Sequence, residues 1–167
     1  MKQFKPLFVC SLVLLAGGFL QVFAQNKKEQ KEKEVKVLLQ NGSYKIDVHR
    51  ALPRSGRAIN LTSLYTLEIR GDSVFSHLPY FGRAYSVPYG GGDGLHFAEA
   101  MEEELISQDK KGNTEIKFQT RTSEDLYQFN IKVFNNGSVS IYVSPTNRQS
   151  ISFQGELRTK ENTPKED

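Results

Sequence analysis

The sequence contains a single cysteine, Cys10, and this residue lies inside the first apolar stretch of the chain. No disulfide can therefore form in the rest of the protein, and its fold depends on a hydrophobic core alone. A lipoprotein signal needs its cysteine after small residues at the end of the apolar run. Here Phe8-Val9 precede Cys10 and the run continues beyond it, so we expect no lipid attachment.

The chain also has little net charge once its first residues are set aside. It contains 22 basic and 19 acidic residues, and without Lys2 and Lys5 the counts become 20 and 19. Proteins that bind nucleic acid or anionic membranes carry a clear excess of positive charge on one face. The near balance argues against both partners.

Only one long apolar run is present, over Leu7–Val22, and Val22-Phe23-Ala24 follows with small residues at the positions that signal peptidase recognises. This order predicts a signal peptide over residues 1–24. The alternative is an uncleaved membrane anchor, because the run approaches the length that spans a bilayer. We expect an exported protein of the periplasm or cell envelope, with no transmembrane helix in its mature part.

Familiar catalytic and metal-binding motifs are missing. The glycine-rich run Gly90–Gly94 lacks the Gly-Lys-Ser/Thr ending of a phosphate-binding loop, and no Gly-x-Ser-x-Gly elbow occurs. His49, His77 and His96 are far apart in sequence, so a zinc site would require distant strands to converge. We therefore predict no catalytic residue, no metal and no cofactor. The alternative is a hydrolase whose catalytic groups are paired carboxylates on facing strands.

The mature chain begins with a charged stretch, residues 25–34, which contains no apolar residue. It is either a solvated linker or the first turns of a helix. Val35, Leu38 and Leu39 follow at helical spacing and predict a short helix that ends near Asn41-Gly42.

From Ser43 onward the apolar residues alternate with polar ones, which is typical of half-buried strands. Turn residues recur at short intervals, and the pattern predicts an all-β domain over residues 35–158, with a disordered tail over 159–167. We expect a single antiparallel meander of about eight strands with a short N-terminal helix. A curved sheet, a lipocalin-like open barrel and a sandwich all remain possible.

Hairpin registers can be predicted because paired residues must share a face of the sheet. A three-residue loop, Asn135–Gly137, places Val133 opposite Val139 and requires a left-handed Gly137. The same reasoning places Ile116 opposite Phe129.

The stretch Phe97–Ile106 fits either a helix or a strand. We favour a strand over Glu103–Gln108, with Leu105 opposite Ile116 across a four-residue loop, Asp109–Gly112.

Residues 71–94 form the least generic part of the chain, with aromatic residues, two prolines and glycines around one arginine. Stacking and cation–π contacts could make this stretch a ligand platform. The alternative is a crossover that packs its rings over an open end of the sheet, with Arg83 bound to backbone carbonyls. The candidate ligand-binding residues are Tyr80, Phe81, Arg83, Tyr85 and Tyr89.

Several motifs make the chain similar to a known family. They are the run Leu78-Pro79-Tyr80-Phe81-Gly82-Arg83-Ala84-Tyr85, the preceding Gly71-Asp72-Ser73-Val74, Gly94-Leu95-His96-Phe97, the Asn136-Gly137 turn, and Arg148-Gln149-Ser150-Ile151-Ser152-Phe153-Gln154-Gly155. Together they resemble the family of exported Bacteroidetes proteins catalogued as domain of unknown function 4251. The resemblance covers roughly residues 35–157 and implies an exported single domain, but no activity.

The expected function is that of a non-enzymatic binding or accessory protein of the bacterial envelope, whose partner is a small molecule or an envelope protein. The alternatives are a structural component of an envelope assembly and, third, a carboxylate-dependent hydrolase with its site inside a barrel.

Overall fold

The computed structural model describes residues 28–86 and 94–159, and in these residues a helix over 28–40 precedes nine β-strands. The strands are β1 (Ser43–Pro53), β2 (Ile59–Arg70), β3 (Ser73–Leu78), β4 (Leu95–Ala100), β5 (Glu102–Gln108), β6 (Thr114–Arg121), β7 (Leu126–Val133), β8 (Ser138–Pro145) and β9 (Ile151–Leu157). The all-β class is confirmed. The stretch that fitted either a helix or a strand forms β4 and β5.

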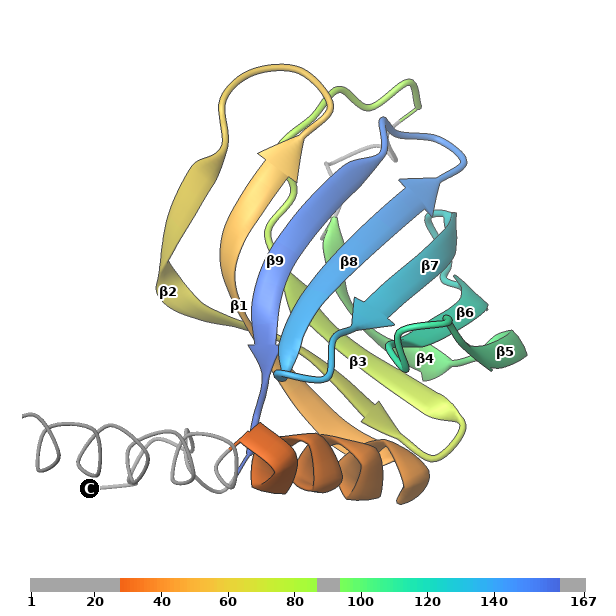
Figure 1. Ribbon diagram of the computed structural model, residues 1–167. Coiled ribbons are helices and arrows are strands. Elements are labelled where there is room, and N and C mark those ends of the chain that lie inside the picture. The colour runs from red at the N-terminus through yellow and green to blue at the C-terminus, as the bar shows by residue number, and fades with distance from the viewer. Residues whose placement is uncertain (1–27, 87–93, 160–167) are drawn as a thin grey trace, which may run out of the picture.

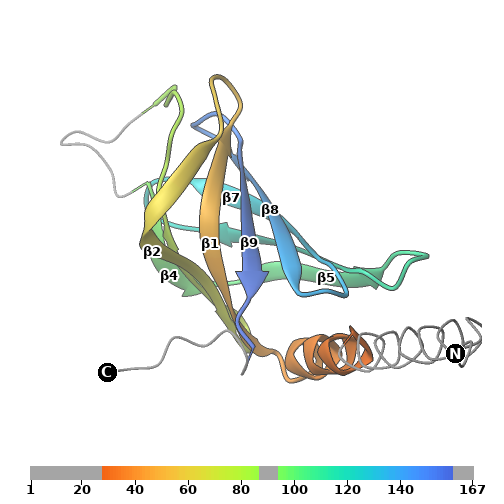
Figure 2. The ribbon, with the colours of Figure 1, turned by 60° about the vertical axis from the view of Figure 1, so that its left-hand side comes forward.

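The strands form one antiparallel sheet in the order β4-β3-β2-β1-β9-β8-β7-β6-β5. Two meanders, β1–β4 and β5–β9, are therefore joined by the pairing of the first strand with the last. The sheet curls into a nearly closed barrel (Figures 1 and 2). Among the three predicted architectures this is the open barrel, with its seam between β4 and β5.

The inward-facing side chains fill the barrel with apolar groups. Strands β6–β9 follow the period of two that their sequence predicts, as in β7, where Tyr127, Phe129, Ile131 and Val133 are buried and the residues between them are more exposed. Phe118 stacks on Phe129 with ring centroids 4.9 Å apart. The largest fully buried side chains, Tyr127 and Phe153, come from β7 and β9, the two strands that flank β8.

Side chains close the seam where the backbone ladder is interrupted. The Tyr127 hydroxyl donates a hydrogen bond to the Gly94 carbonyl over 2.7 Å, and the Thr120 hydroxyl donates one to the Ala100 carbonyl over 2.8 Å. Phe97 of β4 stacks on Tyr127 of β7 at 5.0 Å. These contacts bind β4 to β6 and β7 although the strands do not pair.

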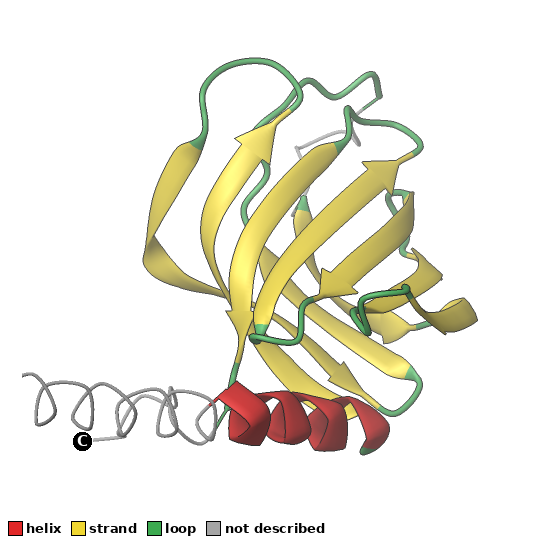
Figure 3. Ribbon diagram, in the orientation of Figure 1, coloured by secondary structure: helices red, strands yellow, loops and turns green. Residues whose placement is uncertain are grey.

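The helix lies across one end of the barrel (Figure 3). Val35 is buried, and Leu38 and Leu39 pack against the core, as their spacing predicted. The structure therefore supports the second alternative for the charged stretch, since residues 28–34 are helical rather than a linker. Gly42, with φ of 64°, ends the helix in the left-handed conformation.

The predicted register of the β7–β8 hairpin is confirmed. Val133 lies opposite Val139 and Ile131 opposite Ile141. The Phe134 N–H donates to the Ser138 carbonyl over 2.9 Å, which leaves a three-residue loop, and Gly137 has φ of 85°.

The β6–β7 register prediction was wrong by two residues, because Ile116 lies opposite Ile131 and Phe129 opposite Phe118. The turn is centred one residue further along the chain than the predicted register requires, since Arg121 pairs with Leu126. The Thr122 hydroxyl accepts hydrogen bonds from the N–H groups of Glu124 and Asp125, both over 3.1 Å, and stabilises the turn at this position.

The β5–β6 prediction was wrong by one residue. Ile106, rather than Leu105, lies opposite Ile116, and a left-handed Gly112 with φ of 78° shortens the loop. The β5 edge strand is exposed along its whole length, so burial on one face did not fix its register.

Candidate functional site

The crossover, residues 79–86, leaves β3 and runs along the loop between β8 and β9. Ala84 forms an isolated antiparallel bridge with Arg148. On either side of it the Tyr85 N–H donates to the Asn147 carbonyl over 2.7 Å, and the Gln149 N–H donates to the Arg83 carbonyl over 2.9 Å. Backbone hydrogen bonds therefore fix the crossover in place without a regular strand.

The first half of the crossover is structural. Tyr80 and Phe81 are half-buried and pack against the core at this end of the barrel. The Tyr80 hydroxyl donates to the Gln149 carbonyl over 2.9 Å, and burial raises the pKa of this phenol. Tyr80 thus has the role that the crossover alternative assigned to Arg83, contact with a loop carbonyl.

The second half of the crossover faces solvent. Tyr85 is 69% exposed, and Arg83 is also exposed. Tyr89 lies outside the described residues. Among the described candidates, Tyr80 and Phe81 therefore pack inward, whereas Arg83 and Tyr85 face outward. Of these four, only Arg83 and Tyr85 are accessible to a large partner.

A buried arginine that the sequence analysis did not single out stabilises this end of the barrel. The Arg148 side chain is 6% exposed, and its Nη2 donates to Glu124 Oε2 over 2.6 Å. Its Nε lies 3.9 Å from Asp125 Oδ2, and its Cζ lies 5.7 Å from the centroid of the Tyr80 ring. These four residues, the Arg148 cluster, join the crossover to the β6–β7 and β8–β9 loops.

Asp125 is the most enclosed carboxylate of the cluster, with its side chain fully buried. It accepts backbone hydrogen bonds from Leu126 and Thr146, both over 2.9 Å, and from Asn147 over 3.1 Å. Its oxygens are therefore occupied in holding two loops together. This arrangement stabilises the barrel end and leaves little of the carboxylate for general acid or base chemistry.

Tyr127 lies beneath this end, at the seam. Burial raises the pKa of its phenol to about 12, with Arg148 acting in the opposite direction. Its hydroxyl therefore stays protonated at neutral pH and donates to the Gly94 carbonyl.

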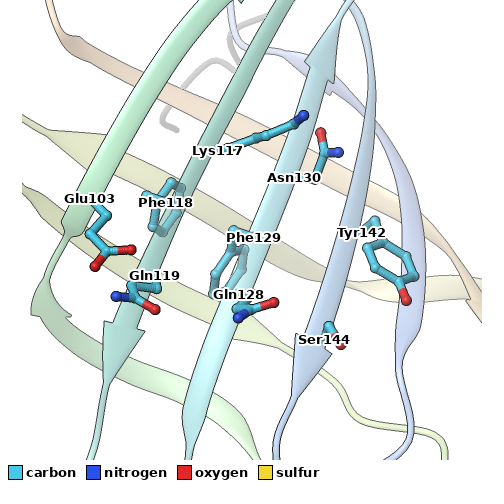
Figure 4. A pocket seen from close by; sticks show the side chains of 9 residues that line it. All are labelled: Glu103, Lys117, Phe118, Gln119, Gln128, Phe129, Asn130, Tyr142 and Ser144. Carbon is cyan, nitrogen blue, oxygen red and sulfur yellow. The ribbon is translucent and has the colours of Figure 1, made fainter.

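The outer face of the barrel carries a groove of about 320 Å³ over β5–β8 (Figure 4). Its polar lining consists of Glu103, Lys117, Gln119, Gln128, Asn130, Tyr142 and Ser144. Phe118 and Phe129 lie behind the strands and fix them from the inside. The sequence analysis treated these outward positions only as the polar side of each strand.

Two of the three histidines come together because β3 pairs with β4. His77 lies opposite His96, and their Nδ1 and Nε2 atoms are 3.2 Å apart on the outer face. His49 lies elsewhere, on β1. Within residues 28–86 and 94–159, no group of three or more histidine, cysteine or acidic side chains is placed to hold a metal ion.

None of the helical residues that the structure describes forms a stretch with the length and apolar character needed to cross a bilayer.

Comparison with known proteins gives the relationship that the motifs suggested. The family model described as "Domain of unknown function (DUF4251)" matches residues 26–157. The chain belongs to the DUF4251 family. No curated protein matches it.

A solved structure supports the same fold. It is a crystal structure of a DUF4251 family protein from Bacteroides eggerthii, with a TM-score of 0.59 and 15% sequence identity. The similarity covers 80% of this chain and 90% of that one.

Two of the stretches that carry the resemblance meet at one end of the barrel. The run that contains Tyr80 and the run that begins at Arg148 touch through the Tyr80–Gln149 hydrogen bond and the Ala84–Arg148 bridge. Gly94 lies against both runs. A Cβ added at this glycine would lie 3.3 Å from the Tyr80 Cβ and 3.6 Å from the Arg148 Nη1. The glycine leaves room for both side chains.

Proposed function

We propose that this protein is an exported, non-enzymatic binding or accessory domain of the bacterial envelope, and that it engages a small molecule or an envelope protein through Arg83 and Tyr85. One observation carries the proposal. Two exposed side chains of the kinds enriched at binding hot spots stand on a segment whose backbone is held by the β8–β9 loop.

A fixed backbone matters for affinity. Binding costs entropy whenever a loop or a side chain becomes ordered. The Tyr85 N–H already bonds to Asn147, and the Arg83 carbonyl already accepts from Gln149. A partner would therefore order only the two side chains.

The carboxylate-dependent hydrolase is less well supported. In the described residues the inward-facing strand positions are mainly apolar, and the buried Asp125 serves backbone N–H groups of two loops. A binding role uses the exposed crossover and needs no reactive group.

A thermal-shift screen tests the proposal on residues 25–167, the chain left by the proposed cleavage. The probes are envelope sugars, peptidoglycan fragments, lipids and bile acids. A probe that raises the melting temperature of wild type, but not of Arg83→Ala or Tyr85→Ala, supports the proposed site. A rise in melting temperature that both variants retain counts against the proposed site. The absence of any rise, with the small-molecule probes and with an extract of envelope proteins, also counts against it.

Export has a separate test. The native protein should be recovered from the periplasm or the cell surface. Its mass should correspond to a chain that begins at Gln25. An intact N-terminus in the native protein would contradict cleavage.

The second candidate is a structural component of an envelope assembly, and the β5 edge favours it. Leu105 and Ile106 are 60% and 58% exposed, on a strand that, among the described strands, pairs with β6 alone. Exposed edges of this kind can pair with another chain. Sedimentation that shows a concentration-dependent oligomer, abolished by Leu105→Lys, would favour this role over ligand binding.

A further inference from the structure

We propose that the outer groove over β5–β8 binds a neutral oligosaccharide. The groove is separate from the crossover. Its lining residues belong to four successive strands, so its position is set by the sheet rather than by a loop (Figure 4).

The polar side chains form two rows across the sheet. Lys117 lies opposite Asn130, and Asn130 opposite Tyr142. In the second row Gln119 lies opposite Gln128, which in turn lies opposite Ser144. The whole groove covers four strands, from β5 to β8, so three strand spacings of ~4.7 Å give a platform ~14 Å across. This width suits a few linked sugar rings.

The chemistry of the rows matches sugar hydroxyls. Each amide of Gln119, Gln128 and Asn130 presents both donors and an acceptor, and a hydroxyl can serve as either partner. No hydrogen bond joins these three amides to another side chain in the part of the chain that the structure describes. Their bonding capacity is therefore available on this face.

An aromatic ring bounds one side of the groove. Tyr142 is 45% exposed and stands at the end of its row, where its face can pack against the apolar side of a sugar ring. Apolar contact beside fixed polar groups is the usual composition of a ligand site.

A strained residue bounds the other side. Glu103 has φ of 54°, the only non-glycine residue with positive φ among those described. The register slips between Glu102 and Leu105, so an extra residue bulges from β5 at this point. Backbone strain of this kind is retained where the surroundings demand it, often at functional sites. Here the bulge places the Glu103 carboxylate at the groove.

The charge of the groove selects a neutral ligand. Glu103 and Lys117 contribute one charge of each sign, and Lys117 also lies 3.9 Å from the Glu115 carboxylate. Among the described lining residues Lys117 is the one cation, so they offer no cluster of positive charge to hold a phosphate or an acidic sugar.

Isothermal titration of the purified protein with soluble tetrasaccharides of glucose, mannose, xylose and N-acetylglucosamine tests the inference. We expect at least one to bind, and Gln128→Ala and Tyr142→Ala each to weaken it about tenfold, the loss of roughly one hydrogen bond or ring contact. Gln154→Ala removes an exposed amide from β9, outside the groove, and should leave the affinity unchanged.

Two results would overturn the inference: no binding of any of the four probes, or binding that both groove variants retain. Tyr85→Ala separates this site from the crossover. An oligosaccharide that loses affinity only in Tyr85→Ala belongs to the crossover and also counts against the groove.

Discussion

Arg148 donates from Nη2 to Oε2 of Glu124 over 2.6 Å, although the two residues are 24 positions apart and lie in different loops. The bond ties the β8–β9 loop to the β6–β7 loop at the end of the barrel where the crossover passes. Because Arg148 is almost fully buried, this pair and the neighbouring Asp125 form a charged cluster within otherwise apolar packing.

Replacing Arg148 with methionine should lower the free energy of unfolding by about 3 kcal/mol, since it removes the cation that faces two carboxylates while keeping most of the side-chain volume. Urea unfolding measures the change. The control is Arg158→Met, whose partner Asp47 is more exposed, and which should cost about 1 kcal/mol or less. Equal losses in the two variants would contradict the role assigned to the Arg148 cluster.

This pair shows what the sequence could not reveal. Arg148 was noticed as part of a family motif, yet nothing in its neighbours indicates burial, because its partners come from a separate loop. The Thr122–Asp125 turn and the Glu103 bulge were likewise missed, and both shift registers. Alternation along each strand was sufficient for the all-β class and for most of the core, because burial on one face has a period of two.

The binding residues were harder to predict for the same reason. Tyr80 and Tyr85 look alike in sequence, and only the Tyr80–Gln149 bond and the exposure of Tyr85 distinguish a packing ring from a presented one. The polar groove was not predicted, since it depends on which outward residues lie side by side on neighbouring strands.

Gly155→Ala should destabilise the pairing of β9 with β1. A Cβ at this position would lie 2.3 Å from the Asp47 carbonyl oxygen, where the β1 register slips between Val48 and Arg50. The bulge lies in β1, opposite Gly155. We expect a loss of about 2 kcal/mol in urea unfolding, typical of overpacking. A variant with the same free energy of unfolding as wild type would contradict the close approach of β9 to β1 at this residue.

Gly137→Ala tests a different property, backbone conformation. At φ of 85° an L-residue is strained, so alanine should cost about 1 kcal/mol and lower the melting temperature. Gly137→Asn should cost less, because asparagine tolerates this region better. Similar melting temperatures for wild type and the alanine variant would contradict the left-handed loop.

Asp109 should give the protein an acid-sensitive component of stability. Its carboxylate accepts from the Asn113 amide over 2.8 Å and lies 2.9 Å from the Lys132 ammonium. Together with backbone N–H donors, these groups hold the pKa of Asp109 well below its ordinary value of about 3.9. Folding therefore favours the ionised form, and the stabilisation is present above about pH 4 and lost as the pH falls through the lower folded value.

Urea midpoints of wild type and Asp109→Asn between pH 7 and pH 2 measure this component. The variant should be less stable at pH 7, and the difference should narrow below about pH 4. A difference that stays constant across the range would show that ionisation of Asp109 does not contribute.

The most direct test of the account is the stability of two tyrosine variants in the same crossover. Tyr80→Ala removes a packed ring and its bond to Gln149, and should cost about 2 kcal/mol. Tyr85→Ala removes a ring that is 69% exposed, and should change stability by no more than about 0.5 kcal/mol. Urea unfolding that shows this separation supports a crossover built to present Arg83 and Tyr85. If Tyr85→Ala is as destabilising as Tyr80→Ala, the whole segment is scaffold and the proposed binding surface is wrong.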